Sequence, residues 1–221
     1  MSSDPPASAG WTGQTGEPTR LFLLRHAQTD RSVERRYSGR GDPELTELGH
    51  AQAASVAAGI RRIGGAEHIA AVLSSPLRRA RQTAEPVAAT LGVPVTLHHG
   101  LTETDFGAWE GLTFREARER DPQLHRRWLG DDTVAPPGGE SFAFAARRVA
   151  ALRDELLLDY PGLRVLLVSH VTPIKLMLRL ALDVGPSLLY RLHLDLASLS
   201  IAEFYPDGGA SVRLVNGRFN G

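Results

Sequence analysis

The order of apolar and polar positions divides most of the chain into short strands and longer helices. Four apolar runs are too short for helices and predict buried strands, at residues 21–24, 69–75, 94–98 and 164–170. Apolar residues at helical spacing predict helices at residues 46–63, 76–92, 141–160 and 172–185. Two late segments, 198–205 and 210–215, flank a "PDGG" turn and predict a hairpin. This alternation predicts a three-layer α/β/α fold, with a mostly parallel sheet and the hairpin as an antiparallel edge.

Helix-start signals and one proline refine these boundaries. Thr46 is a suitable N-cap, and Ser75 with Pro76 predicts the start of the helix that follows the second strand. Thr172 and Pro173 give the same signal after the 164–170 strand. Pro86 lies inside a helical pattern, so we expect a kink or a split there.

Two segments lack this periodicity. Residues 1–19, "MSSDPPASAGWTGQTGEPT", are rich in Pro, Gly, Ser and Thr and predict a disordered tail or linker before one domain at 20–221. Residues 101–139 hold aromatics and short helical stretches, which predicts a lid that selects the substrate. A chain of 221 residues is long enough to bury one sizeable core.

Composition excludes several kinds of chemistry. Without cysteine the chain has no disulfides, thiolate zinc sites or cysteine nucleophile. The 25 basic residues balance 25 acidic ones, so binding to nucleic acid is not expected. All the basic residues except Lys175 are arginine. No run approaches the roughly 20 apolar residues of a membrane span, and no signal peptide is visible. We therefore expect a cytoplasmic protein that does not bind membranes.

Charged and polar residues follow the predicted strands. Arg25 and His26 end the first strand, and His170 ends the fourth. Arg78 and Arg79 fall in the first turn after the second strand. In parallel sheets ligands bind beyond the carboxyl ends of the strands, and arginine suits phosphate oxygens. The pattern predicts an anion site, although each residue could instead end its own strand at the surface.

Phosphoryl transfer also needs an acid to protonate the departing oxygen. Glu103 is a candidate in "LTETDFGAWEG", and Asp105 and Glu110 compete with it. Spacing does not choose among the three.

Six motifs together resemble one family. "LLRHAQT", "GRGDPELTELG", "SSPLRRARQTA", "LTETDFGAWEG", "PPGGESF" and "LVSHVTPIK" follow one another as in the histidine phosphatase superfamily, in its phosphoglycerate-mutase-like branch. The resemblance covers residues 20–216. The chain is most similar to α-ribazole-phosphatase-like acid phosphatases, in particular the phosphatase half of actinobacterial bifunctional ribonuclease H/acid phosphatase proteins.

The resemblance implies a role for each matching residue. His26 is the expected nucleophile, and Glu103 is the expected acid. Arg25, Arg79 and His170 are expected to hold the phosphate. Ser32 and Val171 are the further substrate-binding positions.

Two residues depart from the family pattern, since Ala27 replaces a usual glycine and Ser32 replaces a frequent asparagine. No metal or other cofactor is implied. The expected partner is a small phosphomonoester, and a homodimer is possible. The expected activity is acid phosphatase, and the alternatives are a phosphoglycerate mutase and an inactive phospho-ligand binding module.

Several other residues remain open. Phe106, Trp109, Trp128 and the basic stretch 125–127 either contact the leaving group or pack the lid. His98 and His99 are adjacent on a strand and point to opposite faces, so a metal pair is not expected. Glu140 and Ser141 are expected to cap the following helix.

Overall fold

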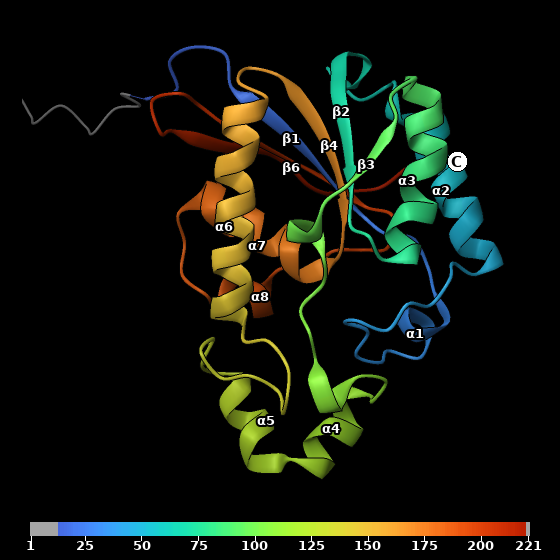
Figure 1. The fold of residues 1–221 in the computed structure, drawn as a ribbon, viewed down its shortest axis with the longest axis vertical. Coiled ribbons are helices and arrows are strands. Elements are labelled where there is room, and N and C mark those ends of the chain that lie inside the picture. Colours follow the sequence, from blue (N-terminus) through green and yellow to red (C-terminus); the bar gives the residue numbers. More distant parts are fainter. Residues whose placement is uncertain (1–12, 220–221) are drawn as a thin grey trace, which may run out of the picture.

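The structure is a computed structural model that describes residues 13–219. At its centre lies a six-stranded sheet of order β3-β2-β4-β1-β5-β6 (Figure 1). The strands are β1 (Thr19–Arg25), β2 (Ile69–Ser74), β3 (Val95–Leu97), β4 (Arg164–Ser169), β5 (Leu199–Phe204) and β6 (Ala210–Gly217). The first four run parallel, whereas β5 pairs antiparallel with both β1 and β6. The predicted fold class, with its antiparallel edge, is confirmed.

Helices cover both faces of the sheet (Figure 1). One face carries α2 (Glu47–Ile60) and α3 (Arg78–Leu91), and the other carries α6 (Phe142–Asp159) and α7 (Val171–Leu182). Strand β1 alternates between them: Leu21 and Leu23 join the core under α6 and α7, and Phe22 and Leu24 join the core under α2 and α3. Each such buried side chain contributes about 1.5–3 kcal/mol, so a strand buried on both faces holds the layers together.

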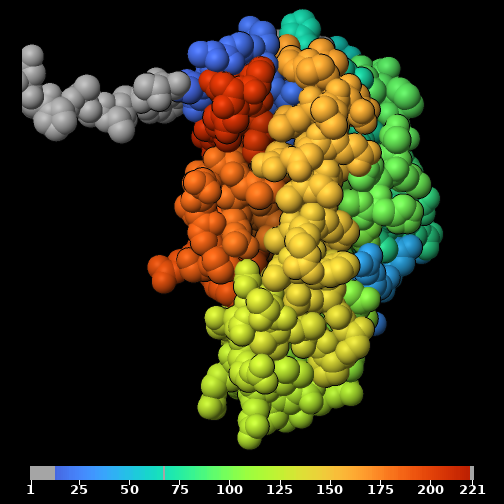
Figure 2. Space-filling model, turned by 60° about the vertical axis from the view of Figure 1, so that its left-hand side comes forward, coloured from blue at the N-terminus to red at the C-terminus, as the bar shows by residue number. Residues whose placement is uncertain are grey.

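Shorter helices complete the chain, namely α1 (Asp30–Val33), α4 (Phe114–Arg120), α5 (Pro122–Trp128) and α8 (Leu188–Arg191), with 3₁₀ turns at Ala66–His68, His99–Leu101 and Gly107–Trp109. Within the 101–139 segment, α4 and α5 project from one end of the body (Figure 2). The sequence does not predict α1 or α8, because four residues are too few to show a helical period.

Two predicted helix starts are wrong by one or two residues. Helix α3 begins at Arg78 after an N-cap at Leu77, because the Ser75 hydroxyl accepts from the Leu77 N–H instead of capping the helix itself. Helix α7 begins at Val171, with His170 as its N-cap, and ends at Leu182.

Of two further helix predictions, the cap at Thr46 is confirmed and the split at Pro86 is not observed. The Thr46 side chain caps α2 by accepting from the Gly49 N–H, as predicted. Pro86 does not split α3. The helix continues around it because one face, from Ala80 to Ala88, is buried in the core, and this packing outweighs one lost backbone hydrogen bond.

The predicted tail is only partly described. Residues 1–12 lie outside the described residues. The Thr15 N–H donates to the Asp207 carboxylate at 2.8 Å, and Gln14 donates to the Ala210 carbonyl, so these residues lie against the β5–β6 hairpin. Thr19 already belongs to β1, so the folded part begins before the predicted boundary at residue 20. Among residues 13–219, no helix is long and apolar enough to cross a membrane.

Candidate active site

The carboxyl ends of β1 and β4 bring two histidines together. His26 follows β1 and His170 follows β4, and the His26 N–H donates to the Ser169 carbonyl at 2.9 Å. The two imidazole centroids lie 5.1 Å apart with an interplanar angle of 56°. Both side chains are buried. Neighbouring parallel strands therefore place both histidines in one site.

The His26 imidazole has one nitrogen free for chemistry. Its Nδ1 lies 2.8 Å from the Ala27 carbonyl oxygen, which can only accept, so the proton is on Nδ1 and the lone pair is on Nε2. Burial lowers the pKa of His26 well below its ordinary 6.5, and the cations Arg79 and Arg25 lower it further. A neutral imidazole with a free Nε2 is the form needed for nucleophilic attack.

His170 is oriented by a serine hydroxyl. Its Nε2 lies 2.8 Å from Ser75 Oγ, and that oxygen also accepts from the Leu77 N–H. We assign the serine proton to Nε2, because the Ser75 hydroxyl has no other acceptor among the described residues, and this assignment places the histidine proton on Nδ1. This buried Nδ1 has no partner among the described residues. Burial lowers the pKa of His170 as well, with Arg79 and His26 adding to the effect.

A loop holds the fully buried Arg79. Its guanidinium donates to the carbonyls of Ser38, Gly39 and Gly41 at 2.8–3.0 Å, which leaves two of its five N–H donors, Nε among them, without an acceptor among the described residues. Glu110 fixes the same loop by accepting from the N–H groups of Gly39 and Gly41. A side chain at position 39 would place Cβ 2.4 Å from the Thr104 carbonyl oxygen, so only glycine fits.

Arg25 is anchored by one hydrogen bond. Its NH1 donates to the Leu194 carbonyl at 2.6 Å, and its buried Nε has no partner among the described residues. Burial lowers the pKa of Arg25 to about 10, despite the opposing charges of Glu103 and Asp195. We call His26, His170, Arg25 and Arg79 the polar end of the site.

Of the three carboxylic acids left open by the sequence, only Glu103 faces the cleft. Its carboxylate accepts from the Thr104 N–H at 2.8 Å and from the Thr172 N–H at the start of α7 at 3.4 Å. Asp105 instead accepts from the Gly107 N–H, and Glu110 holds the loop that supports Arg79. Packing therefore distinguishes residues that spacing could not.

Arg148 of α6 fixes the backbone around Glu103. Its guanidinium donates to the carbonyls of Gly100 and Thr102 at 2.8 and 2.9 Å and pairs with the buried Glu140 at 3.0 Å. Glu140 also accepts from the Asp105 N–H, so one ion pair supports the chain on both sides of Glu103. Ser141 caps α6 as predicted, but Glu140 forms part of this support instead of a cap.

An open cleft of about 970 Å³ leads from the polar end. Arg25, His26 and Glu103 line it, whereas the more deeply buried Arg79 and His170 do not. Much of the remaining wall is aromatic and forms what we call the aromatic half, consisting of Tyr37, Phe106, Phe114, Trp128, Phe142 and Tyr190.

The two further binding positions predicted from the resemblance, Ser32 and Val171, also line the cleft. The Ser32 hydroxyl accepts from the Thr29 N–H in the α1 capping box, and it also donates to the Thr29 carbonyl at 2.7 Å. Its predicted contact with a phosphate oxygen therefore requires this proton to turn away from Thr29.

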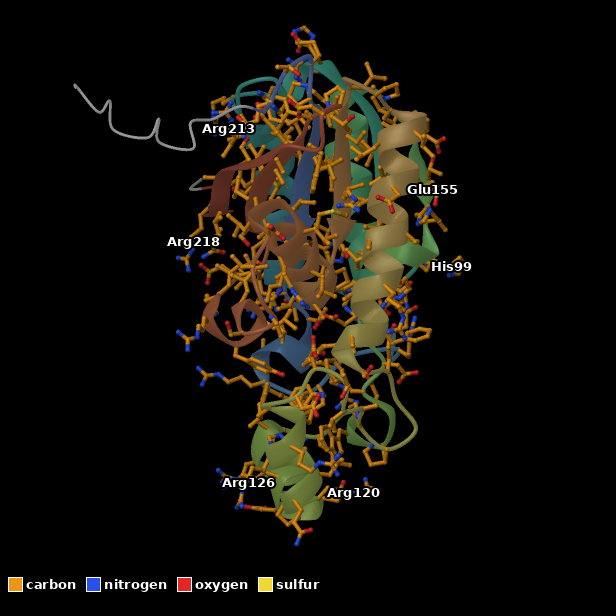
Figure 3. All side chains as sticks on the ribbon, turned by 90° about the vertical axis from the view of Figure 1, so that its left-hand side faces the viewer. His99, Arg120, Arg126, Glu155, Arg213 and Arg218 are labelled. Atoms are coloured by element: carbon orange, nitrogen blue, oxygen red, sulfur yellow. The ribbon has the colours of Figure 1, made fainter. Side chains whose placement is uncertain are left out.

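Of the aromatic and basic residues that the sequence left open in the 101–139 segment, some line the cleft and others do not. Phe106 and Trp128 line the cleft, but Trp109 is fully buried and donates to Asp121. His125 is buried against Tyr37, with the two side chains joined by a 3.1 Å hydrogen bond, whereas Figure 3 shows Arg126 directed outward from the projection.

The His98-His99 pair does not lie on a strand as predicted, because β3 ends at Leu97 and a 3₁₀ turn begins at His99. His98 bonds to Glu155 of α6, and His99 points away from the body (Figure 3). Residues 13–219 contain no group of three or more His, Cys, Asp or Glu side chains that could hold a metal ion.

Sequence reasoning missed several supporting residues. Ser75, Glu110 and Arg148 act through contacts between distant segments, which no local pattern reveals. Lys175 also lines the cleft, and here a signal was present: it lies four residues after Val171, so both fall on one face of α7.

The fold and the site identify the superfamily to which the chain belongs. The profile of the histidine phosphatase superfamily (branch 1) matches residues 21–217, and the chain belongs to this superfamily.

Individual relatives are similar over most of the chain. The bifunctional protein Rv2228c of Mycobacterium tuberculosis is 61% identical over 216 residues, which are 98% of this chain and 58% of that protein. The chain thus spans little more than half the length of this relative. Mycobacterial glucosyl-3-phosphoglycerate phosphatase Rv2419c, solved with VO3, superimposes with a TM-score of 0.80 at 31% identity, covering 90% of this chain and 99% of that one. The α-ribazole phosphatase from Shigella flexneri gives a TM-score of 0.78 at 28% identity, covering 92% and 98%.

Proposed function

We propose that the chain hydrolyses small phosphomonoesters through a phosphohistidine on His26, with no metal. One observation carries this proposal. Arg25 Nε, Arg79 Nε and His170 Nδ1 are buried around His26 and have no acceptor among the described residues. A buried donor without an acceptor costs about 1–3 kcal/mol, so three in one site indicate that their acceptor arrives with the substrate. Phosphate oxygens meet this need.

The first step transfers the phosphoryl group. His26 Nε2 attacks phosphorus, the bond between phosphorus and the ester oxygen breaks, and the departing oxygen takes the proton of Glu103. Arg25, Arg79 and His170 hold the phosphate oxygens and offset their charge. The Nδ1–H bond to the Ala27 carbonyl keeps the ring oriented and supports the positive charge that forms on the imidazole.

The second step restores the enzyme. The Glu103 carboxylate takes a proton from water, the water oxygen attacks the phosphohistidine, and inorganic phosphate leaves with His26 neutral again. The two N–H donors on Glu103 hold its carboxylate in one position for both steps.

The test is release of phosphate from p-nitrophenyl phosphate with EDTA present, by the wild type and His26→Asn. We expect activity that falls by about 10⁴-fold or more in the variant, because the covalent route is lost. Equal activity in both proteins rules the proposal out. Transfer of the phosphoryl group to a second substrate without phosphate release indicates a mutase, and no activity with any ester indicates a binding module.

A further inference from the structure

Lys175 is a cation that the steps above do not use. It is the only lysine of the chain, and it lines the cleft from α7. Its side chain is half-buried. Its single hydrogen bond goes to a neutral group, the Leu189 carbonyl of α8, at 2.6 Å. An ammonium group has three donors, so two remain for a ligand.

Lys175 has no ion-pair partner in the described part of the chain. Burial lowers the pKa of Lys175, and the charge of Glu103 opposes this shift only in part. The Glu103 carboxylate is itself bound to two backbone N–H groups. A cation that is partly removed from water is unfavourable unless a counter-charge compensates. In the described part of the chain Glu103 compensates this charge only in part, and no side chain forms an ion pair with Lys175.

Lys175 lies beside α8, whose residues line the cleft next to the aromatic half. The carbonyl that it binds belongs to Leu189, and Leu189 and Tyr190 both line that part of the cleft. The transferred phosphate already has the donors of Arg25, Arg79 and His170. The ammonium is thus available to the other part of the substrate.

We infer that Lys175 binds a second anionic group, a carboxylate or a second phosphate, on the leaving group of the substrate. This inference rests on the proposed function and narrows its substrate class to phosphomonoesters whose alcohol carries a negative charge. A hydrogen bond between charged partners favours such esters by about 10- to 100-fold over uncharged ones.

The experiment compares matched esters. Glycerol 3-phosphate has no second anion, 3-phosphoglycerate adds a carboxylate, and propane-1,3-diol bisphosphate adds a phosphate. We expect the wild type to have a kcat/KM about 10- to 100-fold higher for one or both of the charged esters. In Lys175→Met this preference should disappear, while hydrolysis of glycerol 3-phosphate and p-nitrophenyl phosphate changes by less than about threefold. Lys175→Arg should keep part of the preference.

Arg179→Met is the control for a structural role. Arg179 lies one turn further along α7 and also donates to a backbone carbonyl, that of Val184, but it does not line the cleft. Its substitution should leave the preference intact. Equal loss for all esters in Lys175→Met would overturn the inference, because the lysine would then act on the transferred phosphate or on the fold. An unchanged preference, or none in the wild type, overturns it too. If no ester, including p-nitrophenyl phosphate, is hydrolysed, the proposed function itself fails.

Discussion

The polar end and the aromatic half line one site but are built differently. At the polar end, one nitrogen each of Arg25, Arg79 and His170 is buried and has no acceptor among the described residues. Other nitrogens of the same side chains are hydrogen-bonded to backbone carbonyls or to a hydroxyl, which fixes their position. In the aromatic half, rings pack against rings, such as Tyr37 with Phe114 at 4.6 Å, and Phe114 and Tyr190 are exposed to solvent. Under the proposed function the polar end binds the phosphate, which is the same group in every substrate. Under the same function the aromatic half contacts the leaving group, so we expect it to influence, together with Lys175, which ester is hydrolysed.

The largest effect should come from removing the acid. Glu103→Gln keeps the shape but supplies no proton, so we expect kcat to fall by about 10²–10⁴-fold for alkyl esters. The loss should be much smaller for p-nitrophenyl phosphate, whose leaving group needs little protonation. Steady-state kinetics on both esters measure the difference, and Asp105→Asn, outside the cleft, is the matched control. A similar loss for both esters argues against Glu103 as the acid.

A smaller effect should follow from loosening the support of Glu103. Arg148→Met removes the donors to the Gly100 and Thr102 carbonyls, so we expect kcat to fall by about tenfold. The loss should again be greater for alkyl esters than for p-nitrophenyl phosphate, which a general loss of stability would not produce. Arg147→Met, at the preceding position of α6 and stacked on Phe144, should leave kcat unchanged for both esters. Equal losses for both esters would indicate that Arg148 acts through the stability of the fold and does not position Glu103.

The polar end should also make stability sensitive to acid. The folded pKa values of His26 and His170 are lowered by burial, so below the ordinary 6.5 the unfolded state binds more protons than the folded state. Stability should therefore decrease as the pH falls from 7 to 5, by at most about 1.4 kcal/mol per pH unit for each histidine.

Urea unfolding at a series of pH values measures this slope. His170→Gln should flatten it, whereas His99→Gln, which alters an exposed ring, should leave it unchanged. Identical slopes in the wild type and His170→Gln contradict the proposed burial cost.

The smallest effect belongs to the aromatic half. Phe114 is 55% exposed and lines the cleft, so Phe114→Ala should raise KM for naphthyl phosphate by about 3- to 10-fold and leave glycerol 3-phosphate unaffected. Phe144→Ala removes a ring that is 54% exposed on α6 but lies outside the cleft, and should alter neither KM. Equal changes for both esters would show that Phe114 does not contact the leaving group.

The sequence predicts the polar end better than the aromatic half for a physical reason. Strand ends follow from local apolar runs, and the topology of a parallel sheet then gathers Arg25, His26 and His170 at one edge. The choice of Glu103 over Asp105, in contrast, depends on which carboxylate the packing turns toward the cleft, and no local pattern contains that contact.

The contacts that hold the site residues in place could not be predicted from local sequence patterns either. Arg79 is held by the 38–41 loop, which lies far from it in the chain, and Lys175 gains its position from α8, which is too short to predict. The family resemblance supplied roles for individual residues, but it did not supply these contacts.

The central claim is a phosphohistidine on His26, and rapid-quench labelling tests it most directly. The enzyme is mixed with a phosphomonoester in EDTA, quenched in alkali and digested, and the peptide containing residue 26 is examined by mass spectrometry. We expect one added phosphoryl group on His26, stable in base, lost in acid and absent from His26→Asn. Rapid phosphate release with no labelled histidine at any quench time, or a label on another residue, would contradict it.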